Sequence, residues 1–167
     1  LLEKWETEWQ MEFNVSKYQV LTSTNKHEPN TIRSDYILHG DTLERVKDAK
    51  YLGVELNGKL NWNSHIQKTA AKANKISAFV YRTIRGCPTK VHSTCYKGLV
   101  RPIMEYAGTV WDTPPSETPG SHDCLERVQR RSARRIFRDF RSTTSATELV
   151  KRLDLPRLSD RRKVARS

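Results

Sequence analysis

The chain has 167 residues, a formal net charge of +11 and a mean hydropathy of −0.75, which is typical of one ordinary domain or two small ones with a modest core. It contains no apolar stretch near the roughly 18 residues of a membrane span, and the acidic start LLEKWETEW is unlike a signal peptide. We therefore expect an intracellular protein, nuclear or cytoplasmic, that is neither secreted nor bound to a membrane. Because it starts and stops without terminal signals, we also expect it to be a piece of a longer polypeptide.

Three cysteines, Cys87, Cys95 and Cys124, are too few for a disulfide scaffold and favour a reducing compartment. His92 and His122 precede two of them, but neither spacing matches a usual zinc pattern. We therefore predict no metal site in this chain, and buried thiols with surface histidines explain these residues equally well.

The charge is unevenly distributed along the chain. Residues 1–61 hold eight Lys/Arg and ten Asp/Glu, whereas residues 62–167 hold twenty-two and nine, so the second part has a net charge of +13. This density predicts a polyanionic partner, although composition alone also allows a basic surface without a ligand.

The N-terminal part predicts short elements. Residues 1–10 predict the end of a helix, and residues 11–23 alternate like a strand, with an optional turn at 14–17. Residues 25–35 predict a loop. A short strand at 36–40 and a polar link at 41–49 follow.

A β-hairpin is the clearest local prediction. Asn57-Gly58 supplies two residues that tolerate positive φ, as a two-residue type I′ turn requires. We expect residues 51–56 to lead into this turn and residues 59–62 to lead out. Gly53, inside the first strand, then marks a bulge or the close approach of another backbone.

A helix is predicted from Asn63 or Ser64 to about Arg85, and its spacing defines two opposite faces. The buried stripe consists of Ile66, Ala70, Ala73, Ser77, Val80 and Ile84. The opposite stripe consists of Lys68, Lys72, Lys75, Phe79 and Arg82. The second stripe is either solvated or lies along a phosphate backbone.

A second helix is predicted over about 89–110, with Gly98 and Pro102 weakening it. Its predicted inner face is Val91, Cys95, Leu99 and Ile103. The Pro-rich stretch 112–121 predicts a linker.

A third helix is predicted over about 122–140, with an apolar and a basic side. The residues expected to face inward are Leu125, Val128, Ile136, Phe137 and Phe140. The basic side consists of Arg127, Arg130, Arg131, Arg134, Arg135 and Arg138. These arginines repel one another unless anions screen them, so we favour nucleic-acid contact over a merely solvated face. Two further short helices are expected, at about 145–154 and from Ser159 onward.

The predicted fold is α+β and mostly α: a small β-hairpin remnant followed by a basic helical bundle. We divide it into residues 1–62, helices at 63–111, a linker at 112–121 and a basic helical extension at 122–167. The sequence has no Gly-rich phosphate loop, GxSxG, HExxH or paired-cysteine motif, and no obvious pair of carboxylates for two magnesium ions. We therefore expect no catalytic centre in this chain.

Four segments, in this order, resemble one family. They are Trp5 to Lys17 (W-x3-W-x-M-x-FN-x2-K), KYLGVELNGKLNWNSHI at 50–66, LVRPIMEYAGTVW at 99–111 and LERVQRRSARRI at 125–136. Together with LPRLSDRR at 155–162, they resemble the C-terminal part of the reverse transcriptase of non-LTR, LINE-type, jockey-like retrotransposons.

The resemblance implies an RNA-directed DNA polymerase that uses magnesium and deoxynucleotides. Lys17 matches a palm lysine that can protonate the departing pyrophosphate, as a general acid. Tyr51, Leu52, Gly53 and Val54 match the primer grip, and the helices that follow match the thumb, which holds the template–primer duplex. Within that thumb, we assign phosphate contacts from the helical periodicity. They are Lys68, Lys72, Lys75, Arg82 and the arginines of the third helix.

One departure from the family is decisive for activity. The YxDD box is absent from this sequence, and the rest of the palm and the fingers are missing too. The resemblance therefore implies a fragment that contributes primer grip and duplex binding, requires the upstream palm and fingers, and does not extend a primer by itself. Two alternatives stay open: a stand-alone basic module that binds RNA or DNA without catalysis, and a helical protein-interaction bundle.

Overall fold

The computed structural model describes residues 2–24, 35–112 and 121–167. Nearly all of the predicted loop at 25–35 and of the predicted linker at 112–121 lies outside these ranges. The chain divides into two compact units, Leu1–Asn61 and Trp62–Ser167. The protein is α+β and mostly helical, as predicted.

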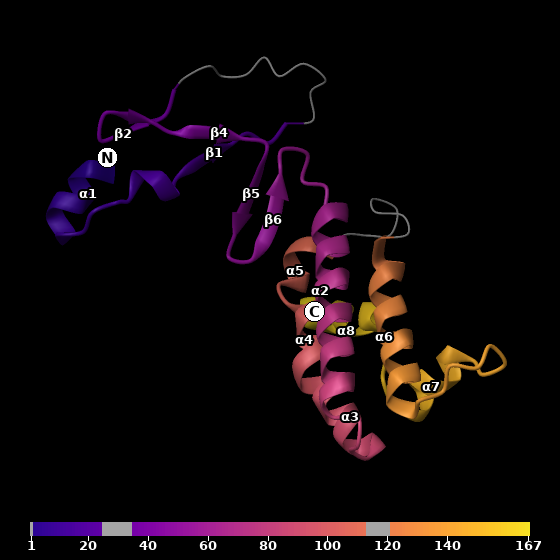
Figure 1. The fold of residues 1–167 in the computed structure, drawn as a ribbon. Helices are drawn as coiled ribbons and strands as arrows, with labels where there is room; N and C mark the ends of the chain where they lie inside the picture. Colours follow the sequence, from indigo (N-terminus) through magenta and orange to yellow (C-terminus); the bar gives the residue numbers. More distant parts are fainter. Residues whose placement is uncertain (1, 25–34, 113–120) are drawn as a thin grey trace. The chain divides into compact units, whose positions relative to one another are not determined.

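The first unit consists of short elements that pair locally (Figure 1). They are α1 (Leu2–Trp9), the 3₁₀ turn η1 (Val15–Lys17), β1 (Gln19–Leu21), β2 (Ile37–Leu38), β3 (Asp41–Thr42), β4 (Glu44–Val46), β5 (Asp48–Tyr51) and β6 (Val54–Asn57). Strands β1 and β4 pair in parallel, whereas β2–β3 and β5–β6 are antiparallel. The prediction of a plain link at 41–49 was wrong, because β3, β4 and the start of β5 lie there despite their polar side chains. The strand predicted at 11–23 is reduced to β1, with η1 at the optional turn.

The predicted hairpin is present, but its turn is not where we predicted it. Tyr51 pairs with Val54, so the two-residue turn is Leu52-Gly53, with φ of 46° and 83°. Positive φ at both positions is the signature of a type I′ turn. Gly53 is therefore a turn residue, and both interpretations that we gave it in the sequence, a bulge or a close approach within a strand, were wrong.

Asn57-Gly58 forms a different turn, which leads from β6 toward the next helix. The Asn57 side-chain Oδ1 accepts hydrogen bonds from the backbone N–H of Lys59 at 3.2 Å and of Asn61 at 2.8 Å. At Gly58 a Cβ atom would lie 2.8 Å from the carbonyl oxygen of Thr22, so only glycine fits this close approach. The same residue types that favour a hairpin turn thus serve a side-chain-stabilised turn here.

The revised turn makes Gly53 a sensitive position. We expect Gly53→Ala to destabilise the β5–β6 hairpin by roughly 1 kcal/mol, because a Cβ atom is unfavourable at positive φ. Gly53→Asn, the matched control, should cost less, since asparagine tolerates the left-handed region. Hydrogen exchange of the β5 and β6 amides measures the difference, and equal protection in both variants would contradict the turn assignment.

The second unit is helical. Its elements are α2 (Asn63–Thr83), α3 (Thr89–Cys95), the π-turn η2 (Tyr96–Val100), α4 (Arg101–Glu105), α5 (Gly108–Trp111), α6 (Ser121–Phe137), α7 (Ala146–Arg152) and α8 (Leu158–Arg166). The buried stripe predicted on α2 is confirmed at Ile66, Ala70, Ala73, Ser77 and Val80, whereas Ile84, its last member, is half-buried and follows the helix end. It packs against η2, α4 and α6.

The predicted second helix is interrupted, and its inner face was wrong. The N–H of Arg101 bonds the carbonyl of Tyr96, which makes a π-turn directly before Pro102, where an α-helical turn would clash with the proline ring. The side chains that point inward are His92, Tyr96, Val100, Met104 and Trp111. Val91 and Leu99 are exposed, and Cys95 and Ile103 are half-buried.

Helices α2 and α6 lie side by side and run in the same direction (Figure 1). Ser77 Oγ lies 2.8 Å from Ser132 Oγ at mid-length, and Arg138 hydrogen-bonds the carbonyl of Arg85 at the C-terminal end. Leu125, Val128 and Ile136 are buried as predicted, whereas Phe137 is half-buried. Phe140 was predicted to face inward but lies beyond the helix end and is exposed.

Candidate nucleic-acid interface

Helix α2 belongs to a segment without any acidic residue. Residues 56–104 hold nine Lys/Arg and no Asp/Glu, so nothing within this stretch neutralises its charge. Because the opposite face of α2 is buried, Lys68, Lys72, Lys75 and Arg82 are all exposed. Phe79 lies on the same face and is 57% exposed. This face is the stripe that the sequence predicts.

On α6, the structure divides the six predicted arginines by what they contact. Arg127 and Arg130 pair with Asp123 at 3.1 and 2.9 Å. Hydrogen bonds from Arg130 and Arg127 lower the pKa of Asp123. These two arginines thus have an internal counter-charge, which weakens their case as phosphate contacts.

Arg134 has a structural role at the end of α6. Its guanidinium donates to the backbone carbonyls of Arg141 at 2.9 Å and Thr144 at 2.8 Å. These bonds fix the chain where α6 ends and the loop to α7 begins. Sequence reasoning placed Arg134 in the phosphate-binding stripe, but its hydrogen-bonding capacity is largely used within the protein.

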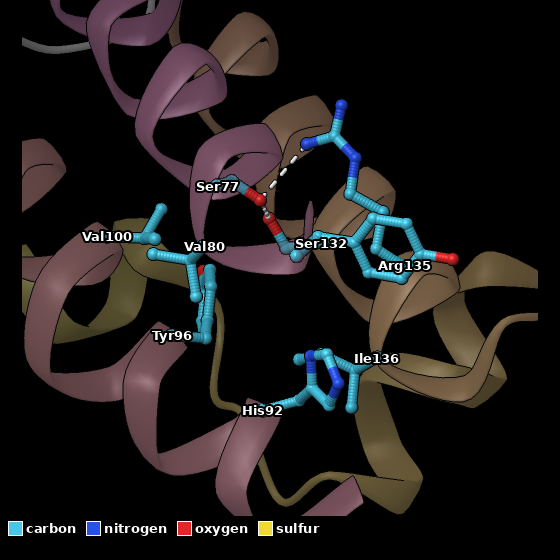
Figure 2. Close-up of a pocket in the computed structure, with 9 residues that line it drawn as sticks. Ser77, Val80, His92, Tyr96, Val100, Ser132, Arg135 and Ile136 are labelled. Atoms are coloured by element: carbon cyan, nitrogen blue, oxygen red, sulfur yellow. Dashed lines mark hydrogen bonds between the residues drawn. The ribbon is translucent and has the colours of Figure 1, made fainter. Parts of the chain in front are cut away.

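Arg135 reaches from α6 to α2, and Arg138, the residue directly after α6, reaches the chain just beyond the end of α2. Arg135 Nη1 donates to Ser77 Oγ at 3.0 Å and to Asn74 Oδ1 at 3.3 Å, whereas Arg138 bonds the carbonyl of Arg85. Figure 2 shows the Arg135–Ser77 bond next to Ser132, with the other guanidinium nitrogens pointing away from the cavity below. Both arginines therefore tie the two parallel helices together.

Arg131 and Arg82 are exposed and act on Arg135 from the two helices. Burial lowers the pKa of Arg135, and the positive charges of Arg131 and Arg82 lower that pKa further. As a name for five basic residues of these two adjacent helices, and not for their line of contact, we use α2–α6 seam for Lys72, Lys75, Arg82, Arg131 and Arg135. In the part of the chain that the structure describes, no carboxylate forms an ion pair with a residue of this seam.

The cavity beside the seam is too small for a nucleotide. It has a volume of about 10 Å³, room for about one water molecule, and lies between α2, α3, η2 and α6 (Figure 2). His92 Nε2 is buried there and has no hydrogen-bond partner among the described residues. Tyr96, also at this cavity, donates to Gln129 Oε1 at 2.9 Å, and burial raises its pKa, which keeps the donor protonated. This site is a packed polar core rather than a binding pocket.

A buried ion cluster that the sequence did not indicate lies around Asp112. Its carboxylate contacts Arg162 Nε at 2.9 Å, Arg166 Nη2 at 3.0 Å and His122 Nδ1 at 3.3 Å. Arg162 is only 2% exposed and lies over the ring of Trp111. We placed Asp112 in a linker because of the prolines after it, and only the approach of α8 shows its role.

A larger cavity of about 220 Å³ lies nearby, between α5 and α8. Its two arginines, Arg161 and Arg162, pair with Glu105 and Asp112. Both guanidinium charges are therefore compensated by carboxylates, although Arg162 Nη1 has no hydrogen-bond partner among the described residues, and we assign the cavity no ligand.

The four predicted primer-grip residues form the tip of the β5–β6 hairpin. Tyr51 and Leu52 are 66% and 72% exposed, Gly53 forms the turn and Val54 is buried. Lys17 is exposed at the end of η1. Among the residues that the structure describes, no carboxylate forms an ion pair with Lys17, and its catalytic role stays what the resemblance implies.

The described residues contain no group of three or more His, Cys, Asp or Glu side chains that could hold a metal ion. The magnesium that the resemblance implies thus has no fitting site in the described chain, and we derive no reaction step through it. Among the described residues, no helix is long and apolar enough to cross a membrane.

The α2–α6 seam is thus the best-supported candidate site, because four of its five cations are exposed and none of the five pairs with a described carboxylate. Comparison with known proteins gives no second source for its role: no family model, no curated protein and no solved structure matches this chain.

Proposed function

We propose that the helical unit binds the sugar–phosphate backbone of a nucleic-acid duplex through the α2–α6 seam. The single observation that carries this proposal is a set of five cations on two adjacent helices without a carboxylate partner among the described residues. Lysine and arginine contacts to phosphates release condensed counterions, which makes such binding favourable and independent of sequence.

The resemblance supports the further proposal that this activity belongs to a reverse transcriptase. In this proposal the chain is the palm end and thumb of a LINE-type, non-LTR retrotransposon polymerase, and the duplex is its template–primer. The exposed tip of the β5–β6 hairpin supports a primer-grip role for Tyr51 and Leu52. The upstream palm and fingers of the same polypeptide would supply the catalytic carboxylates and their magnesium. The reading frame upstream of Leu1 should then encode a YxDD box.

Salt dependence tests the binding proposal. If each of the five seam residues neutralises one phosphate, the affinity for an RNA–DNA hybrid should fall with a log–log salt slope between about −4 and −5. Fluorescence anisotropy with a labelled hybrid at several salt concentrations measures this slope. Binding that does not change with salt, or no binding at low salt, would contradict the proposal.

One observation favours a second candidate, the helical protein-interaction bundle. Several apolar side chains between α3 and α5 are exposed, among them Val91, Leu99, Tyr106 and Val110. A protein partner could cover them. This candidate predicts complex formation that persists at high salt, since burial of apolar surface is not screened by ions.

A further inference from the structure

Arg135 differs from the other arginines of α6 in how its guanidinium is held. Nη1 is occupied by Ser77 and Asn74 of α2, and Ser77 is in turn within 2.8 Å of Ser132. Nε and Nη2 make no hydrogen bond with a described residue. One edge of the planar group is therefore fixed to the protein, and the other edge is left available (Figure 2).

The available edge has the geometry that binds an oxyanion. Nε–H and Nη2–H of a guanidinium are parallel donors that match two oxygens of one phosphate, and a lysine cannot reproduce this arrangement. Because Nη1 is already held, less side-chain entropy is lost when the edge binds.

Two further cations act on this position. Arg131 lies one helical turn before Arg135 on α6, and Arg82 lies in the last turn of α2, near enough for its charge to act on Arg135. Burial is the main reason for the lowered pKa of Arg135, and the charges of Arg131 and Arg82 lower that pKa further, so both cations repel the Arg135 guanidinium. An anion between them would remove this repulsion.

We propose that Arg82, Arg131 and Arg135 form a phosphate clamp in which Arg135 binds one backbone phosphodiester through its Nε–Nη2 edge. The clamp rests on the proposed function and deepens it. At the other positions of the α2–α6 seam lysine and arginine are equivalent, whereas position 135 requires arginine. Asn74 and Ser77 are its positioning residues, because they hold Nη1 and do not touch the phosphate.

A charge-preserving substitution tests the clamp. Arg135→Lys keeps the charge but loses the paired donors, so we expect its affinity for the RNA–DNA hybrid to fall roughly tenfold with an unchanged salt slope. Arg131→Lys, the matched control one turn away, should bind like the wild-type chain. Equal affinities of the two variants would overturn the clamp while leaving the proposed function in place.

A second variant guards against a folding artefact. Asn74→Ala removes one holder of Nη1 without touching the charges, and it should weaken binding about threefold with the helical circular dichroism unchanged. If the wild-type chain does not bind the hybrid at all, the proposed function and the clamp both fail.

A final measurement separates a backbone phosphate from free phosphate. At equal ionic strength, inorganic phosphate offers the clamp the same oxygens but reaches none of the other seam cations, so it should stabilise the wild-type chain against thermal unfolding slightly more than chloride does and much less than the hybrid does. Stabilisation by inorganic phosphate that equals the stabilisation by the hybrid would overturn the assignment to a phosphodiester backbone.

Discussion

Replacing Asp112 with Asn should lower the free energy of unfolding of the helical unit by about 3–5 kcal/mol, the typical cost of breaking a buried ion pair. Asp112 is buried and contacts both Arg162 and Arg166. The amide keeps the size of the side chain but removes its charge, which leaves the buried Arg162 without a counter-ion. Chemical denaturation followed by circular dichroism measures the change.

Asp123 provides a matched control, because its carboxylate also contacts two arginines, Arg127 and Arg130. It differs in being exposed, so water and salt screen its interactions. We expect Asp123→Asn to cost less than about 1 kcal/mol. If Asp112→Asn and Asp123→Asn lower the free energy of unfolding equally, burial is not the reason that the Asp112 cluster stabilises the helical unit.

Removing three charges from α2 should have the largest effect on binding. We expect the triple variant Lys72→Ala, Lys75→Ala and Arg82→Ala to reduce the magnitude of the log–log salt slope by about three. At 0.1 M salt its affinity for the duplex should fall roughly several-hundredfold. The reason is that each lost phosphate contact forfeits the release of about one counterion. Anisotropy titrations with several duplex sequences check the result, and the loss should be alike for all of them.

The matched control removes the same charge from arginines that are already paired. Arg127, Arg130 and Arg141 each bond a carboxylate, so their replacement with Ala should weaken binding far less. If both triple variants lose affinity equally, net charge alone drives binding, and the seam has no special role.

Periodicity predicted α2 well because the signal there is strong and local. A long helix with small and apolar residues on one face and cations on the other has only one way to bury a core. The segment 89–111 was harder to predict, because two different faces of it repeat every four residues and either could be the buried one. The more apolar face, with Val91 and Leu99, is exposed, whereas the face with His92 and Tyr96 is buried. Tyr96 is accommodated because Gln129, thirty-three residues away, accepts its hydroxyl.

The candidate site was predicted in composition but not in detail. The sequence identifies the basic faces, yet it cannot show which arginines are occupied within the protein. Arg134 donates hydrogen bonds to carbonyls of the loop after α6, and Arg127 forms an ion pair with Asp123. Which partner each arginine finds depends on the fold of the chain. The hairpin shows the same limit locally, since glycine follows both Leu52 and Asn57, and only the strand pairing shows which of the two pairs forms the hairpin turn.

The absence of acidic residues from positions 56–104 also affects folding. Cations brought together on α2 and α6 repel each other in the folded state, and dissolved ions relieve that repulsion. The same ions compete with the protein for phosphates and weaken a nucleic-acid complex. Ionic strength thus acts in opposite directions on the two equilibria: salt that stabilises the free helical unit releases its ligand, and a bound polyanion takes the place of the salt.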